Sequence, residues 1–256
     1  ILGTYFLLTF KKKEDSVIAV IFSGLFFAMA ALTKSFAFFL PLFIIIGALI
    51  FKFASFKRTA VMTAAFILFT LPWGIRNMIV LDHYTPVSTE GGISLYWENH
   101  EGAVTGKGYT QPEKFDLEAF SNMNEIGRSK YYSKLALKYI ISHPFLFFKR
   151  ASGRIWELLK PMPRAGLSGG FAPAEFLFRI GYGVIYLPVI ILFLLSLSSI
   201  RKEPLIAFSF VIFIFFLLVY GLVAGKTRYR MPLEPFLIIS ATTYLTRYFK
   251  WGKNES

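Results

Sequence analysis

The sequence predicts an all-α integral membrane protein with about seven transmembrane helices, the first of them truncated, and a mixed, mainly helical loop domain on the outer side. Three observations predict this fold. Of the 256 residues, 55% are hydrophobic and 17% are charged, against about 45–50% and 25% in a typical soluble domain. The apolar residues fall into runs long enough to cross a bilayer as helices, which takes about 20 residues. Basic residues gather in the short segments between these runs.

Seven apolar runs, separated by charged or polar breaks, predict the spans in chain order. They are residues 1–10, 16–33, 36–51, 59–75, 178–200, 204–224 and 231–245. The first run begins partway through a helix, so we expect the natural protein to extend further toward the N-terminus. The chain then divides into transmembrane helices 1–4 at residues 1–78, a loop domain at 79–177, and transmembrane helices 5–7 with a polar tail at 178–256.

The Lys and Arg residues of the short loops predict the orientation of the chain. One side holds Lys11, Lys12, Lys13, Lys52, Lys57, Arg58, Arg201, Lys202, Arg247, Lys250 and Lys253, and the other holds Lys34, Lys226, Arg228 and Arg230. Short loops rich in Lys and Arg stay in the cytoplasm, whereas long loops cross the membrane regardless of charge. The sequence therefore predicts a multi-pass protein of the cell (plasma or inner) membrane, with a cytoplasmic tail and an extracytoplasmic loop domain.

The loop domain has two kinds of segment. Residues 85–92 and 99–108 contain the Gly, Ser, Thr, Asn and Pro typical of turns and are expected to be loops. Residues 125–142 place apolar side chains broadly on one side and predict an amphipathic helix, which Pro144 interrupts. Residues 144–160 predict a second helix, basic and rich in aromatic residues, of the kind that lies along a membrane interface.

Composition removes several classes of function. The net charge is +13, but the basic residues lie mainly between apolar runs, which indicates topology and contact with membrane lipids rather than nucleic acid. The chain has no Cys, which excludes disulfides and thiolate chemistry. No Walker loop for ATP occurs. The three His residues form no ligand set, so no metal residue is assigned; a divalent metal stays open because His100 lies between Glu98 and Glu101.

Two isolated cations on the predicted outer side are candidates for binding an anion. Lys34 stands alone between two spans, and its alternative role is that of a lysine extending from a helix end to the interface. Arg76 follows Pro72 and Trp73 at the end of the fourth span and stands next to an amide, Asn77. Ionisable groups close to lipid are costly, so each needs a partner or a function.

Residues 226–230 form the densest basic cluster, with three cations and a phenol in the sequence Lys-Thr-Arg-Tyr-Arg. Arg suits phosphate because its planar guanidinium donates two parallel hydrogen bonds. The alternative is a structural pair between Arg230 and Glu234, four residues later on a helix. We predict a phosphate-binding site on the outer side that consists of Lys34, Arg76, Arg228, Tyr229 and Arg230.

Three acids of the loop domain are the best placed to reach the same outer face. Glu90, Glu98 and Glu101 follow or lie within the predicted loops. They are candidates for an acceptor-side loop, and the alternative for each is an ordinary solvated loop residue.

Several stretches together carry a family resemblance. They are ALTK at 31–34, PWGIRN at 72–77, TPVSTEGG at 85–92, YWENHEGAVTG at 96–106, KYIISHP at 138–144, FFKRASGRIWELLKP at 147–161 and RYRMPLEP at 228–235. In these stretches, and in their order and sidedness, the chain resembles the C-terminal part of the bacterial family 39 glycosyltransferases. These are GT-C type membrane enzymes related to the protein mannosyltransferases and to the lipid A aminoarabinose transferases.

The resemblance implies a polyprenyl-phosphate-linked sugar as donor and a lipid, glycan or protein acceptor at the outer face. It also implies that the catalytic base lies in a first outer loop upstream of Ile1, so no catalytic residue is assigned here and this fragment is expected to be inactive alone. Such a transfer needs a base for the acceptor hydroxyl and cations on the departing phosphate. The alternative function is a transporter or flippase for lipid-linked glycans, which uses the same basic face without chemistry.

Overall fold

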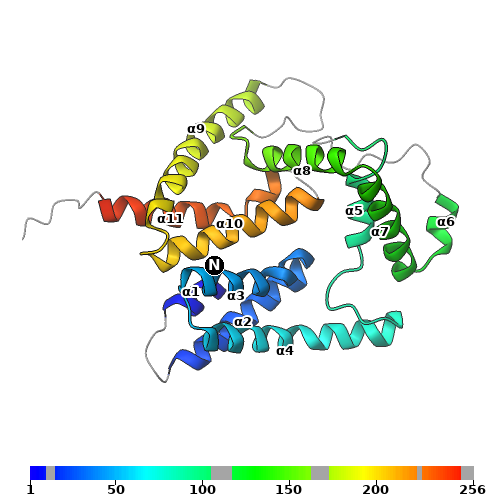
Figure 1. The fold of residues 1–256 in the computed structure, drawn as a ribbon, viewed down its shortest axis with the longest axis horizontal. Coiled ribbons are helices and arrows are strands. Elements are labelled where there is room, and N and C mark those ends of the chain that lie inside the picture. The colour runs from blue at the N-terminus through cyan, green and yellow to red at the C-terminus, as the bar shows by residue number, and fades with distance from the viewer. Residues whose placement is uncertain (10–14, 105–116, 163–172, 224–226, 249–256) are drawn as a thin grey trace, which may run out of the picture.

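The computed structural model describes residues 1–9, 15–104, 117–162, 173–223 and 227–248, and all regular structure within these ranges is helical (Figure 1). The α-helices are α1 (Leu2–Thr9), α2 (Asp15–Thr33), α3 (Leu40–Phe51), α4 (Phe56–Leu81), α5 (Gly91–Glu98), α6 (Leu117–Asn122), α7 (Glu125–Ser142), α8 (Pro144–Leu159), α9 (Pro173–Ser196), α10 (Pro204–Val223) and α11 (Glu234–Tyr248). Three short 3-10 helices are η1 (Ser35–Phe39), η2 (Leu197–Ser199) and η3 (Thr227–Arg230). The all-α prediction is confirmed for the described residues.

Among the described residues, three helices are long and apolar enough to cross a membrane. They are Phe56–Leu81, Phe176–Ser199 and Pro204–Val223, which correspond to the fourth, fifth and sixth predicted spans. The second and third predicted spans correspond to shorter apolar helices at Val17–Thr33 and Ser35–Phe51. The eight residues of α1 and the 15 of α11 are fewer than the roughly 20 that a bilayer needs. The structure thus identifies a membrane protein with three candidate spans, and the full set of seven stays a prediction.

Helix α4 continues beyond the point where the sequence predicted its span to end. The prediction ended the span at residue 75, but the helix passes through Pro72 and ends at Leu81, before Asp82 in a left-handed conformation (φ 50°). A proline removes only one backbone donor, and surrounding groups compensate for it in membrane helices. The buried Asn77 fixes the last turns by donating through Nδ2 to the backbone oxygen of Thr85 at 2.9 Å.

The two helices predicted within the loop domain are present. Helix α7 has the predicted bounds, and α8 ends one residue before the predicted limit of 160. Asn124 starts α7 by accepting a 2.7 Å hydrogen bond from the backbone N–H of Gly127, as an N-cap residue does. Helix α5 was not predicted, and its first two residues, Gly91 and Gly92, belong to the stretch 85–92 that was expected to be a loop.

Glycines allow the apolar helices to pack closely. A Cβ on Gly24 of α2 would lie 2.5 Å from the backbone oxygen of Met62 in α4. A Cβ on Gly47 of α3 would lie 2.2 Å from Cγ2 of Val211 in α10. Small residues bring helix backbones together where a membrane offers little hydrophobic driving force between helices. In Figure 1, α1–α4 form one group of helices and α9–α11 form another. The two groups are joined where α3 packs on α10, and α5 and α7 lie toward one end of the molecule.

Candidate functional site

A cavity of about 790 Å³ lies where three separate segments meet. Its walls come from residues 32–43, where α2 passes through η1 into α3, from residues 88–94 at the start of α5, and from residues 218–223 with Tyr229 at the end of α10 and in η3. Segments far apart in the sequence therefore build one site at the ends of helices.

Lys34 and Arg228 both lie beside the ring of Tyr229. The Lys34 Nζ lies 5.1 Å from the ring centroid, and the Arg228 Cζ lies 5.0 Å from it. Arg228 also donates through Nη2 to the Tyr229 hydroxyl at 3.2 Å. Lys34 reaches this place because its extended backbone (φ −140°, ψ 101°) separates α2 from η1. Two cations on one phenol ring are within cation–π range, so three of the five predicted phosphate-binding residues come together.

The Tyr229 ring is held by two further aromatic side chains. It stacks on Tyr220 of α10 with centroids 4.8 Å apart and an interplanar angle of 14°. Tyr220 is itself packed edge-on against Phe36 of η1 at 4.7 Å. These contacts join η1, α10 and η3, so they fix the ring that Lys34 and Arg228 both approach.

The segment at residues 88–94 contributes an acid and two hydroxyls to the cavity lining. Ser88, Glu90 and Ser94 line it, with Gly91 between them. Glu90 precedes α5 as its N-cap residue, and its carboxylate makes no capping hydrogen bond. Its backbone N–H donates to Ser88 Oγ at 3.2 Å. Among the described residues, no ion pair joins the Glu90 carboxylate to Lys34.

Arg230 lies elsewhere, although only one residue separates it from Arg228. Its side chain is fully buried. Its Nε donates to Glu234 Oε1 at 3.0 Å and its Nη2 donates to the Tyr182 hydroxyl at 2.7 Å. Its Nη1 donates to the backbone oxygens of Leu158 and Lys160, at 3.2 and 2.9 Å. The structural pair with Glu234, considered above as the alternative, is present, and the cavity does not include Arg230.

Arg76 also lies outside the cavity. It is exposed near the end of α4, where its Nη1 donates to Asn77 Oδ1 at 2.9 Å. Its guanidinium lies over the Trp73 ring, 5.3 Å from the centroid. These contacts place Arg76 on the surface of α4, and it is not among the residues that line the site.

Glu98 and Glu101 belong to a segment held by two buried arginines of α8. Arg154 donates through Nη1 to the backbone oxygen of Glu98 at 3.1 Å, and Arg150 donates through Nη1 to that of His100 at 2.8 Å. Glu98 is buried and Glu101 is exposed. Neither lines the cavity, so Glu90 is the one candidate acid that does.

Arg154 is an important residue that the sequence analysis missed. Besides Glu98, it bonds the backbone oxygen of Gly221 through Nε at 2.7 Å and Asn99 Oδ1 through Nη2 at 3.4 Å. Burial lowers the pKa of Arg154 to about 10, which nearby Arg150 reinforces and Glu98 opposes; the group stays charged at neutral pH. The available signal was a pair of arginines four residues apart on a helix otherwise rich in apolar residues.

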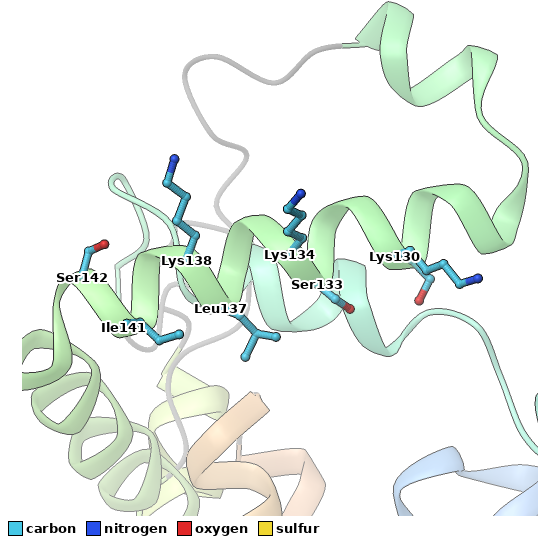
Figure 2. Close-up of a pocket in the computed structure, with 8 residues that line it drawn as sticks. Lys130, Ser133, Lys134, Leu137, Lys138, Ile141 and Ser142 are labelled. Atoms are coloured by element: carbon cyan, nitrogen blue, oxygen red, sulfur yellow. The ribbon is translucent and has the colours of Figure 1, made fainter.

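A second hollow, of about 670 Å³, follows one helix only. It is lined by α7 residues, and Figure 2 shows Lys134 and Lys138 directed to one side of the helix and Leu137 and Ile141 to the other. Because one helix supplies every lining residue, groups from different segments do not converge there. Within the described ranges, no cluster of three or more His, Asp or Glu side chains is arranged to hold a metal.

The cavity beside Lys34 is therefore the place where the described residues bring a cation, aromatic rings and an acid together; Arg228 is not a lining residue and contacts the site through the Tyr229 ring. Comparison of the chain with known proteins identified no relative. No protein-family model, curated protein or solved structure matches the chain.

Proposed function

We propose that the chain is the C-terminal part of a membrane glycosyltransferase that transfers a sugar from a polyprenyl-phosphate donor to an acceptor at the extracytoplasmic face. In this proposal Lys34, Arg228 and Tyr229 bind the donor's phosphate. The observation that carries it is that Lys34, which lines the cavity, and Arg228 each lie about 5 Å from the centroid of the Tyr229 ring, which also lines the cavity. A phosphate bound beside this ring would be attracted by both cations.

The apolar walls of the cavity suit the lipid part of such a donor. Leu32, Phe39, Leu218 and Leu222 line it, and each keeps between 43% and 57% of its surface exposed. All four lie on or beside apolar helices, where exposed surface is solvated by lipid in a membrane. A polyprenyl chain therefore has an apolar path that leads away from the phosphate-binding end.

The cations would act on the charge that develops during transfer. The bond between the sugar's anomeric carbon and the phosphate oxygen breaks, and the anomeric carbon forms a bond to the acceptor oxygen, whose proton passes to a base. The bonding electrons leave with the phosphate, so its negative charge grows as the bond breaks. Lys34 and Arg228 stabilise that charge more in the transition state than in the ground state, which raises the rate as well as the affinity. No residue described here is assigned as the base.

The test is sugar transfer by the protein with its natural upstream sequence, normalised to folded protein. Lys34→Ala and Arg228→Ala should each lower kcat/KM about 10- to 150-fold, since one charge-assisted contact contributes about 1.5–3 kcal/mol. Arg228→Lys should recover only part of the loss because an ammonium cannot form two parallel hydrogen bonds. Lys130→Ala, a change of an exposed lysine on α7, is the matched control. Near-normal kcat/KM in Lys34→Ala, Arg228→Ala and Arg228→Lys would contradict the phosphate site. If the unchanged protein binds the donor but transfers no sugar, a transporter or flippase is favoured instead.

A further inference from the structure

The cavity lining contains two chemically different polar groups. Lys34 lies beside the Tyr229 ring, and Glu90, Ser88 and Ser94 come from the segment that leads into α5. Leucine, valine and phenylalanine side chains supply much of the remaining lining. A headgroup whose phosphate contacts Lys34 therefore shares the cavity with the polar groups of residues 88–94.

The Glu90 carboxylate is free to serve a ligand. It makes no capping bond to α5, and no ion pair or side-chain hydrogen bond engages it among the described residues. Glu90 and Lys34 line one cavity, and among the described residues no ion pair joins them. The same cavity thus offers a cation and a separate carboxylate, which suits a ligand with an anionic group and hydrogen-donating groups.

The backbone next to Glu90 leaves space for a group to approach. Gly91 lines the cavity, and a Cβ placed on it would meet no atom within 4 Å. A Cβ introduced at this exposed lining position would therefore displace no protein atom. This makes Gly91 a steric probe that is independent of the Glu90 charge.

From these observations we infer that Glu90 selects the sugar of the donor, accepting hydrogen bonds from a neutral or amine-bearing sugar and rejecting one that carries a carboxylate. This inference rests on the proposed phosphate site. Hydroxyl or ammonium groups donate to a carboxylate in strong, charge-assisted bonds. A sugar acid would instead place a second negative charge against Glu90, and like charges in contact are strongly disfavoured. Glu90 acts here as a specificity residue on the donor side, rather than on the acceptor side as the sequence suggested.

The experiment measures the binding of three ligands to the chain in lipid nanodiscs. The ligands are a polyprenyl phosphate without sugar, the same lipid carrying a neutral hexose, and the same lipid carrying a hexuronic acid. The unchanged protein should bind the neutral conjugate about tenfold or more tightly than the acidic one. Glu90→Gln should reduce this ratio to within about threefold while leaving the affinity for bare polyprenyl phosphate unchanged, because the amide removes the charge and keeps the shape.

Two further variants separate charge from shape and from general damage. Gly91→Val should weaken binding of both sugar conjugates and leave bare polyprenyl phosphate unaffected. Asp82→Asn is the matched control for Glu90→Gln, because Asp82 lies outside the cavity and Asn tolerates its left-handed backbone. An unchanged ratio between the neutral and acidic conjugates in Glu90→Gln overturns the inference alone. If Lys34→Ala leaves the binding of bare polyprenyl phosphate unaltered, the underlying phosphate site is overturned instead.

Discussion

The Nε of Arg154 donates a 2.7 Å hydrogen bond to the backbone oxygen of Gly221. The same buried guanidinium bonds the backbone oxygen of Glu98, so it joins the end of α10 to the end of α5. Residues of both helices line the cavity. Arg154 therefore sets the position of one cavity wall relative to another without itself being part of the cavity lining.

Replacing Arg154 should loosen this junction. Arg154→Met leaves at least two buried carbonyl oxygens without their donor, each at a cost of about 1–3 kcal/mol, so we expect a Tm lower by several degrees. Arg154→Lys should recover little, since one ammonium cannot reproduce the fork of donors. The measurement is thermal unfolding in detergent, with Lys149→Met on the exposed side of α8 as the control. A Tm equal to that of the control would show that the junction does not depend on Arg154.

Arg228 and Arg230 should respond to substitution in opposite ways. Arg230 is buried and bonds Glu234, Tyr182 and two backbone oxygens, so Arg230→Gln should lower folded yield and Tm. Arg228 is exposed beside Tyr229, so Arg228→Gln should keep the Tm within about 1–2 °C and weaken binding of polyprenyl phosphate. Both quantities are measured on the same purified samples. Equal losses of stability in the two variants would contradict the division of roles.

These two arginines also show why the sequence alone did not separate binding from structure. Both occur in one basic cluster, and no pattern in the sequence ranks one above the other. In the 3-10 helix η3 there are about three residues per turn, so positions two apart face different directions. The Arg230 side chain is buried against α9 and α11, where it bonds Tyr182 and Glu234, whereas the Arg228 side chain is exposed. The direction of a side chain in such a short element depends on tertiary packing, which periodicity does not encode.

The helices likewise separate into those that the local sequence pattern predicted and one that depends on tertiary packing. Helices α7 and α10 were predicted nearly to the residue, because the prolines at 144 and 204 mark where helices stop or start and the apolar pattern is continuous. Helix α5 was missed because it is only eight residues long and starts with two glycines. Its stability comes from packing on α7, where a Cβ on Gly92 would lie 2.1 Å from the backbone oxygen of Ser129. Glu90 was among the predicted acids, but the helix α5 that follows it in the cavity wall was beyond local sequence reasoning.

The orientation predicted from the basic loops is testable with single cysteines, because the chain has no Cys. Ser55 precedes α4 in a predicted cytoplasmic loop, and Ser121 lies in α6 within the predicted outer loop domain. In intact cells, a thiol reagent that does not cross the membrane should label Ser121→Cys and spare Ser55→Cys. Labelling after permeabilisation is the control for accessibility. The reverse pattern would place the cavity on the cytoplasmic side and end the assignment of an extracytoplasmic donor site.

The break between α7 and α8 should contact the membrane surface. Ile141 and Phe145, on either side of the break, expose 76% and 82% of their surfaces. The break is braced by His143, whose ring stacks on Tyr139 at 4.5 Å. Apolar side chains presented by basic amphipathic helices enter the lipid interface. A fluorophore on Ile141→Cys or Phe145→Cys should be quenched by nitroxide lipids, and one on Lys134→Cys, on the other side of α7 (Figure 2), should be quenched less. Equal quenching at all three positions would contradict this placement.

The most direct test of the phosphate site is the affinity of the purified chain for polyprenyl phosphate without sugar, measured by titration at fixed ionic strength in nanodiscs. Lys34→Ala and Arg228→Ala should each raise Kd about 10- to 150-fold. The double variant should lose less than the sum of the two single losses in free energy, because both cations act on one anion. Lys130→Ala should bind like the unchanged protein. A Kd within twofold of the unchanged protein in both Lys34→Ala and Arg228→Ala, with folding intact, would contradict the site and with it the proposed function.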